Sequence, residues 1–299
     1  MIALYLLSLL FAISPSEKKA ISYANPAWSP DGTHLAFESN LEGQRSIYTI
    51  RTDGTELRRL TDTTYEDGQP DWSPDGRQIA FYSRRNGRQQ LYCMQADGSD
   101  QLRISQTEHD EFDPDWSPDG QWLAFLSRPP GSDCHALTIM RPEGTGRRTL
   151  SDSRQNCFRP SWSPDGSQIA CVVTKPMREY SISTYADLKA HMEIWCFLPE
   201  GEPPVQLTQN EVADRVPFWA ADGKLVYFIR EEGLNEYLYS IKPSGKQLKK
   251  RRLANWVGEP ALSPDGKRLA FRSHIDGCFG LFLSKLDGSG VVRLICQER

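Results

Sequence analysis

The 299-residue sequence has no apolar run long enough to cross a membrane and no strong excess of charge of either sign. Its longest apolar run covers residues 2–13, whereas a membrane-spanning helix needs about 20 apolar residues. The formal net charge is −4, and the one basic cluster, residues 249–252, has the pattern of a solvated strand edge. These features argue against a membrane span in the mature protein and against nucleic acid as a partner.

Motifs for catalysis and metal binding are also scarce. The sequence has no Gly-x-Ser-x-Gly motif, the nucleophile elbow of many hydrolases. Its five histidines are scattered, and no two have the spacing of zinc ligands; they are His34, His109, His135, His191 and His274. We therefore expect no catalytic residues and no cofactor, and enzymatic activity is the less favoured interpretation.

The sequence does contain a six-fold repeat. Its copies are NPAWSPDGTHLAF, QPDWSPDGRQIAF, DPDWSPDGQWLAF, RPSWSPDGSQIAC, VPFWAADGKLVYF and EPALSPDGKRLAF, which begin at Asn25, Gln69, Asp113, Arg159, Val216 and Glu259. The Ser of Ser-Pro-Asp-Gly, or the Ala that replaces it in the fifth copy, recurs at intervals of 44, 44, 46, 57 and 43 residues. Such periods are typical of propeller blades.

Each repeat contains four strand signals separated by turn signals. The first turn is Ser-Pro-Asp-Gly, and a second, usually Asp-Gly, follows the third strand. The pattern predicts an all-β fold, a six-bladed β-propeller of four-stranded antiparallel blades. The expected blades cover residues 24–62, 68–106, 112–151, 158–208, 215–254 and 258–296. Because the sixth unit contains all four of its own strands, we expect no strand exchange between the ends of the chain.

The apolar run at residues 2–13 lies outside the repeat. It has the length of the apolar region of a secretory signal peptide, and Ser14 and Ser16 supply small residues before a cleavage site. A buried first strand is the alternative. We expect residues 1–16 to be a signal peptide and residues 17–299 to form the propeller, located in the periplasm or secreted.

The repeated motif Pro-x-Trp-Ser-Pro-Asp-Gly-x-x-Ile/Leu-Ala-Phe resembles that of the TolB-like family of WD-repeat-like propellers, over roughly residues 20–299. The namesake of this family is the periplasmic component of the Tol-Pal system. The same repeats occur in the propellers of dipeptidyl-peptidase-type hydrolases, tricorn-like proteases and oligogalacturonate lyases. The resemblance therefore implies the fold more specifically than the function.

Two sets of repeated positions are candidates for different roles. The aspartate of the first turn recurs in every blade, so we interpret it as structural, its carboxylate accepting backbone N–H groups within the turn; the set is Asp31, Asp75, Asp119, Asp165, Asp222 and Asp265. The residue before the motif proline varies, as a binding surface or a tolerant loop would; the set is Asn25, Gln69, Asp113, Arg159, Val216 and Glu259. We expect this second set to encircle one mouth of the channel, where Asp113 and Glu259 could hold Ca²⁺.

The fourth repeat carries an insertion of 13 residues, which falls within residues 174–193. It contains Arg178, Tyr180 and Tyr185, residue types that are enriched at interfaces. We expect this loop and Trp256 to contact a partner on the rim formed by the connections after the second and fourth strands. A solvated insertion without function is the alternative.

The number of cysteines is seven, which is odd. Cys93, Cys171 and Cys196 lie at strand positions and are interpreted as structural. Cys278 and Cys296 could meet across one hairpin, and Cys134 and Cys157 flank another turn. In an oxidising compartment either pair could form a disulfide.

The favoured function is that of a non-enzymatic scaffold, a monomer that binds a protein or peptide partner at one face of the ring. The alternative is an enzyme, a glycan lyase or hydrolase that acts at the channel mouth.

Overall fold

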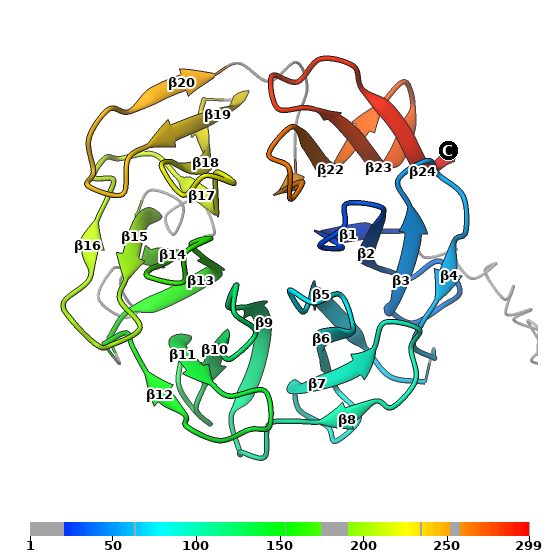
Figure 1. Cartoon of the computed structure of the whole chain (residues 1–299), viewed down its shortest axis with the longest axis horizontal. Coiled ribbons are helices and arrows are strands. Elements are labelled where there is room, and N and C mark those ends of the chain that lie inside the picture. The colour runs from blue at the N-terminus through cyan, green and yellow to red at the C-terminus, as the bar shows by residue number, and fades with distance from the viewer. Residues whose placement is uncertain are drawn as a thin grey trace, which may run out of the picture.

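The computed structural model of the chain describes residues 21–62, 64–152, 154–174, 191–233, 235–251 and 258–298. These residues form six four-stranded antiparallel sheets arranged as a ring around a central axis (Figure 1). The predicted six-bladed propeller is confirmed. Within the described ranges no helix is long and apolar enough to cross a bilayer.

The first three blades follow one another along the chain. Blade 1 contains β1 (Tyr23–Trp28), β2 (His34–Ser39), β3 (Ser46–Arg51) and β4 (Arg58–Arg59). Blade 2 contains β5 (Asp67–Trp72), β6 (Gln78–Ser83), β7 (Gln90–Gln95) and β8 (Leu102–Arg103). Blade 3 contains β9 (Asp110–Trp116), β10 (Leu123–Arg128), β11 (Ala136–Met140) and β12 (Arg148–Thr149).

The last three blades complete the ring. Blade 4 contains β13 (Asn156–Trp162), β14 (Ile169–Thr174), β15 (Glu193–Phe197) and β16 (Val205–Gln206). Blade 5 contains β17 (Asp214–Trp219), β18 (Val226–Glu232), β19 (Asn235–Ile241) and β20 (Lys249–Arg251). Blade 6 contains β21 (Gly258–Leu262), β22 (Arg268–Ile275), β23 (Cys278–Lys285) and β24 (Val292–Glu298). Each sheet is built from consecutive strands, so the ring closes without strand exchange.

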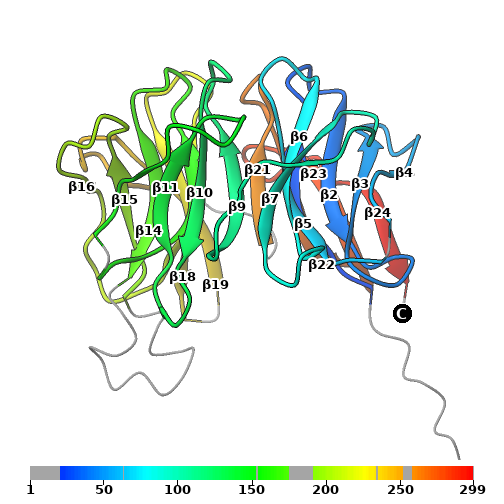
Figure 2. The same cartoon turned by 90° about the horizontal axis from the view of Figure 1, so that it is seen from below.

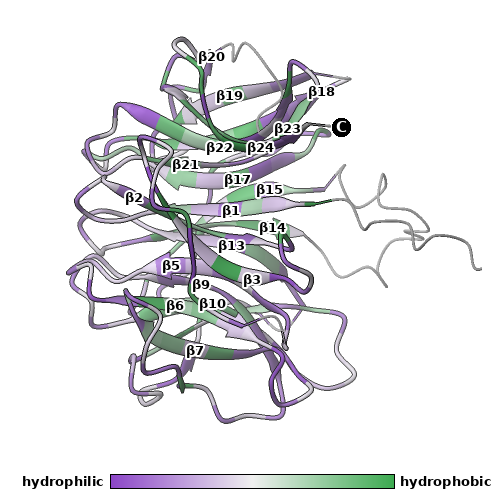
Figure 3. Cartoon of the chain, turned by 90° about the vertical axis from the view of Figure 1, so that its right-hand side faces the viewer, coloured by the Kyte–Doolittle hydropathy of each residue, from purple (hydrophilic) through white to green (hydrophobic). Residues whose placement is uncertain are grey.

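The first strand of every blade lies next to the axis, and the strands stand between two rims (Figures 1 and 2). The turns after the first and third strands form one rim, which we call the turn rim. The connections after the second and fourth strands form the other, which we call the connector rim. Hydrophilic residues predominate in the turns, and hydrophobic stretches fall within the strands (Figure 3).

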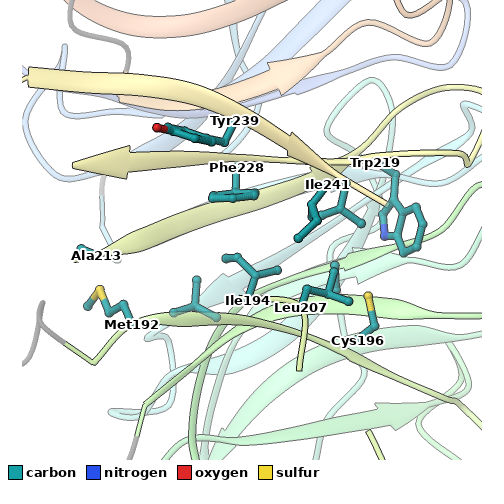
Figure 4. Packing of buried hydrophobic residues seen from close by; sticks show 12 residues of the cluster. Met192, Ile194, Cys196, Leu207, Ala213, Trp219, Phe228, Tyr239 and Ile241 are labelled. Carbon is teal, nitrogen blue, oxygen red and sulfur yellow. The ribbon is translucent and has the colours of Figure 1, made fainter. Parts of the chain in front are cut away.

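The hydrophobic core lies between neighbouring blades, because each sheet places apolar residues on both faces. Between blades 4 and 5, Ile194 of β15 faces Phe228 of β18 and Ile241 of β19 (Figure 4). All three side chains are buried. Similar clusters lie between the other blades, so the core forms a closed series of interfaces around the axis.

The cysteines differ in their bonding state. Cys278 and Cys296 form a disulfide that links β23 to β24. Cys134 and Cys157, the other pair that flanks a turn, form no disulfide. The bonded pair therefore fixes the outermost strand of the last blade, a strand of seven residues where the other outermost strands have two or three.

Candidate functional site: the central channel

The six residues that precede the motif prolines share an unusual backbone conformation. Their φ angles are positive, between 50° and 58°; they are Asn25, Gln69, Asp113, Arg159, Val216 and Glu259. The pairing of the first and second strands shifts at this point in every blade, which marks a β-bulge. A proline can occupy a bulge because its missing N–H is not needed there. Since even the β-branched Val216 adopts this conformation, it belongs to the blade architecture.

The bulges allow neighbouring blades to bond to each other around the channel. The backbone N–H of Asp113 donates to Oε1 of Gln69 at 3.0 Å, and that of Arg159 donates to Oδ2 of Asp113 at 2.9 Å. At the closure of the ring, the Asn25 N–H donates to Oε2 of Glu259 at 3.0 Å. The amide or carboxylate before the proline therefore joins its own blade to the next one at these three junctions. Between blades 1 and 2, the Gln69 N–H donates instead to Oε2 of Glu38 at 2.8 Å. This role could not be inferred from one repeat considered alone.

Arg159 reaches across the channel. Its guanidinium lies 3.6 Å from Oδ1 of Asp113 and donates to Oε1 of Glu259 at 3.1 Å. It also donates to the side-chain oxygen of Asn25 in blade 1, which lies across the axis from blade 4 (Figure 1). One side chain thus connects blades 1, 3, 4 and 6 through three acceptors.

A cavity of about 450 Å³ lies on the axis next to this network. All six residues before the prolines line it, as do Pro164, Ala221 and Pro264 of the first turns. The ring of variable residues therefore does come together. We expected these residues at the connector rim. The cavity that they line extends instead toward the turn rim.

The wall of this cavity is acidic on one side and apolar on the other. Blades 2 and 3 contribute three carboxylates. Blades 5 and 6 contribute mainly hydrophobic side chains and one carboxylate, that of Glu259, which is paired with Arg159. The acidic set is Asp71, Asp113 and Asp115; the apolar set includes Val216, Pro217, Phe218, Trp219, Pro260 and Leu262. The cavity can therefore accept a group that carries both apolar surface and a positive charge or hydrogen-bond donors.

Asp71 and Asp115 occupy the middle position of Pro-x-Trp in adjacent blades. Oδ2 of Asp71 accepts the Trp116 N–H at 2.7 Å, and Oδ2 of Asp115 accepts the Trp162 N–H at 2.6 Å. Burial raises the pKa of Asp71 to about 7, against the opposing effect of the backbone N–H groups of Trp116 and Trp72, and the charge of Asp113 adds to the rise. Burial, followed by the charge of Asp71, raises the pKa of Asp115 well above its usual range. The two carboxyls cannot both ionise easily near neutral pH.

Asp71 was not among the residues expected to form the site. Its signal was present in the sequence, because the middle position of Pro-x-Trp holds Asp in blades 2 and 3 and an uncharged residue in the others. Aligning this position around the ring would have placed the two carboxyls side by side.

A second cavity of about 260 Å³ lies on the connector-rim side. Arg159, Val216 and Glu259 line it as well, so the residues before the prolines contribute to both cavities. Met192, Arg215 and other residues of blades 4, 5 and 6 complete its wall. The guanidinium of Arg215 is already paired with Glu231 and Glu236.

The repeated aspartates of the turn rim bond within their own turns. Each Oδ1 accepts the backbone N–H two residues later, at 3.0–3.1 Å; the residues are Asp31, Asp75, Asp119, Asp165, Asp222 and Asp265. In blade 1, for example, the Ser29 hydroxyl also donates to Oδ1 of Asp31.

The remaining expected partner contacts, Arg178, Tyr180, Tyr185 and Trp256, lie outside the described residues. Across the ranges that the structure covers, no three His, Cys, Asp or Glu side chains are placed together so that they could hold a metal ion.

Comparison with known proteins identifies the family. Residues 12–194 match the family model of the TolB β-propeller domain. A stretch of 42 residues is 43% identical to an uncharacterised protein of Agrobacterium fabrum, and another comparison gives 50% identity over 42 residues with an uncharacterised peptidase of Bacillus subtilis. These stretches are 14% of this chain, and 14% and 6% of the two relatives.

Solved structures share the fold at low sequence identity. TolB from Acinetobacter baumannii superposes with a TM-score of 0.66 at 17% identity, over 90% of this chain and 61% of that one. A putative TolB from Agrobacterium tumefaciens gives a TM-score of 0.66 at 19% identity, over 81% and 84%. Oligogalacturonate lyase from Vibrio parahaemolyticus gives 0.61 at 16% identity, over 92% and 78%. The family match covers more than half of the sequence, and the chain belongs to the TolB β-propeller family.

Proposed function

We propose that the protein is a non-enzymatic scaffold that binds a protein or peptide partner in the axial cavity, in the periplasm or outside the cell. The observation that carries the proposal is the two-sided wall of this cavity. An extended segment with a basic side chain next to a hydrophobic one would satisfy Asp71 and Asp115 while burying apolar surface against Phe218 and Leu262. The ring supports such a site well, because interblade bonds hold its wall in place.

The proposed location has two lines of support. The apolar run at residues 2–13 has the length of a signal-peptide core. The disulfide between Cys278 and Cys296 suits an oxidising compartment. Mass spectrometry of the protein expressed with its own N-terminus tests this assignment. A mature protein that starts near Glu17 and is recovered outside the cytoplasm is expected; a cytoplasmic protein that retains Met1 would refute it.

Affinity capture from the envelope fraction of the source organism tests the binding function. The bait is compared with a double variant, Asp71→Asn/Asp115→Asn, which removes both ionisable carboxyls but keeps the shape of the cavity. The matched control is Asp100→Asn, which makes the same chemical change at an exposed site with positive φ that Asn tolerates. A partner retained by the wild type and the control and lost from the double variant is expected. Equal capture by all three would place the binding site elsewhere.

A lyase is the second candidate, and one observation favours it. A carboxyl whose pKa is held at about 7 in an open cavity is suited to general acid–base catalysis, as Asp71 would be. The chain also spans most of the Vibrio lyase. Incubation with oligogalacturonate, with and without EDTA, tests this candidate through the ultraviolet absorbance of unsaturated products. Turnover by the wild type that Asp71→Asn abolishes would replace the scaffold proposal.

A further inference from the structure

A small pocket recurs where the turn rims of neighbouring blades meet. It is formed by the motif tryptophan and turn glycine of one blade, and by the turn proline and the second residue after the turn glycine of the preceding blade. Between blades 6 and 1 these residues are Trp28, Gly32, Pro264 and Arg268. We call this repeated feature the junction pocket.

The junction pocket between blades 6 and 1 is filled by the protein itself. The guanidinium of Arg268 lies 4.8 Å from the ring centroid of Trp28, within the range of a cation–π contact. The same group donates to the carbonyl oxygen of Gly32 at 3.2 Å. The pocket thus offers an indole face and a carbonyl acceptor to a planar cation.

The junction pocket between blades 1 and 2 has the same components without the arginine. A cavity of about 460 Å³ is lined there by Pro30, His34, Trp72 and Gly76, which correspond to Pro264, Arg268, Trp28 and Gly32. Trp72 is partly exposed, whereas Trp28 retains only 8% of its exposure. The indole nitrogen of Trp72 is buried without a hydrogen-bond partner.

Two further junctions differ from this one. Between blades 3 and 4 the position of Arg268 is held by Trp122, which packs against the hydrophobic cluster that contains Trp162 and has the Arg141 guanidinium 4.4 Å from its ring centroid. Between blades 2 and 3, where Gln78 holds this position, the cavity is about 220 Å³. The cavity between blades 1 and 2 is therefore about twice as large as the one between blades 2 and 3.

The charges around the open pocket favour a cation. Four carboxylates line it and one guanidinium, that of Arg58; the carboxylates belong to Asp31, Glu56, Asp75 and Asp97. Two of them have a neighbouring arginine outside the lining, Glu56 with Arg51 at 3.5 Å and Asp75 with Arg77 at 3.8 Å, so the lining itself keeps an excess of negative charge. The Oδ1 atoms of the three aspartates bond within their own turns, but their charges still act on the cavity.

We propose that the junction pocket between blades 1 and 2 binds a guanidinium group, the arginine side chain of a polypeptide partner. The guanidinium lies over the indole of Trp72 and donates to the carbonyl of Gly76, as Arg268 does at the equivalent junction. This site is separate from the axial cavity, so the proposal does not depend on the function proposed for that cavity.

Nuclear magnetic resonance of the full chain tests the site directly. Eight tryptophans give eight indole N–H signals, and Trp72→Phe identifies that of Trp72. The probe is N-acetyl-arginine methylamide, and its neutral control is the citrulline analogue, which has nearly the same shape. We expect the arginine probe to shift the Trp72 signal with at least a tenfold lower dissociation constant than the control. Equal affinities, or no shift at Trp72, would overturn the proposal.

Two variants distinguish a specific effect on the pocket from a general loss of folding, because each should change one tryptophan signal in a defined way. His34→Arg should fill the pocket from within the chain, so the Trp72 signal should move without a probe and stop responding to it. Arg268→Ala should open the junction between blades 6 and 1, so the Trp28 signal should begin to respond. A His34→Arg protein that binds the probe unchanged would contradict the assignment. Tighter binding of methylguanidine than of the peptide probe would support the pocket but contradict a polypeptide source for the guanidinium.

Discussion

Arg159 is the residue on which most of the channel's polar bonds converge. Replacing it with methionine keeps much of its apolar stem but leaves the carboxylates of Asp113 and Glu259 without their shared cation. We expect Arg159→Met to lower the free energy of unfolding by about 3 kcal/mol, as measured by urea denaturation. The control is Arg77→Met, at a side chain that is 83% exposed, which should change stability by less than about 0.5 kcal/mol. Similar small effects for both variants would contradict a bridging role for Arg159.

Asp71 makes stability depend on pH in the direction opposite to that of most carboxyls. Its pKa is about 7 in the folded protein and about 3.8 as the ordinary value, so the folded state binds more protons between these limits. Stability contributed by the protonated form is therefore lost as the pH rises from about 4 to about 7. Asp71→Asn should stabilise the protein above pH 7 by roughly 1–3 kcal/mol. Its amide oxygen can still accept the N–H of Trp116.

Thermal unfolding of Asp71→Asn and of the wild type across pH 4–8 checks this expectation. The curve of the variant should be flatter through this range, and the exposed Asp100→Asn should follow the wild type. A wild-type protein whose stability rises steadily from pH 4 to pH 8, with no change on substitution of Asp71, would be inconsistent with a proton held at this site.

At the scale of elements, the turns after the third strands contact the preceding blade. A Cβ on Gly144 would lie 2.4 Å from the carbonyl oxygen of Ile104, whereas one on Gly201, in the equivalent turn of blade 4, would meet nothing within 4 Å. Both glycines have φ near 90°, a conformation that L-residues rarely adopt. Gly201→Ala should therefore cost about 1–2 kcal/mol from backbone strain alone. Gly144→Ala should cost at least about 2 kcal/mol more, because a packed backbone must move.

Chemical denaturation of both alanine variants separates backbone strain from the interblade contact. The two variants share the φ penalty, so the difference between their unfolding free energies reports the packing against Ile104. Equal losses would mean that the neighbouring blade yields easily.

The disulfide acts on a single element, the outermost strand of blade 6. It closes a sequence separation of 18 residues, for which the loss of chain entropy in the unfolded state predicts about 3 kcal/mol. Cys296→Ser should lower stability by about 2–3 kcal/mol under oxidising conditions and by little under reducing conditions. Cys134→Ser, at a cysteine outside the disulfide, is the control. A reduced wild type that is as stable as the oxidised one would show that β24 is held without the bond.

Much of the fold could be predicted because each repeat carries its own turn chemistry. Ser-Pro-Asp-Gly, or Ala-Ala-Asp-Gly in blade 5, specifies a turn locally, so six copies of this turn specify six blades. The site was less accessible, since its contacts join residues that are far apart in sequence. The bond from Arg159 to Asn25 spans 134 residues, and no property of a single repeat indicates it. The rim toward which the cavity extends also depends on how far along the channel axis the β-bulge lies. A strand pattern in the sequence does not specify this position.

At the scale of the whole molecule, the blades are independent in sequence and joined by short connectors. A circular permutant that joins residue 298 to residue 21 through a copy of residues 61–66, and begins between blades 3 and 4, should fold to the same ring. We expect its melting temperature to lie within a few degrees of that of the wild type, because every sheet keeps all its strands. Loss of cooperative unfolding in the permutant would indicate that the natural chain order is needed for closure.

The uneven distribution of interblade bonds gives the ring a preferred place to break. Blades 6 and 1, which no peptide bond joins directly, are held by Asn25 to Glu259, by the indole of Trp28 to the Ala261 carbonyl at 3.0 Å, and by Arg268. Between blades 5 and 6, Val216 offers no acceptor, and Leu262 replaces the tryptophan donor. Under mechanical load the circle should therefore part first between blades 5 and 6, where the chain itself still tethers the two sides. An interface opened in this way can form again, because the peptide chain keeps blades 5 and 6 close together.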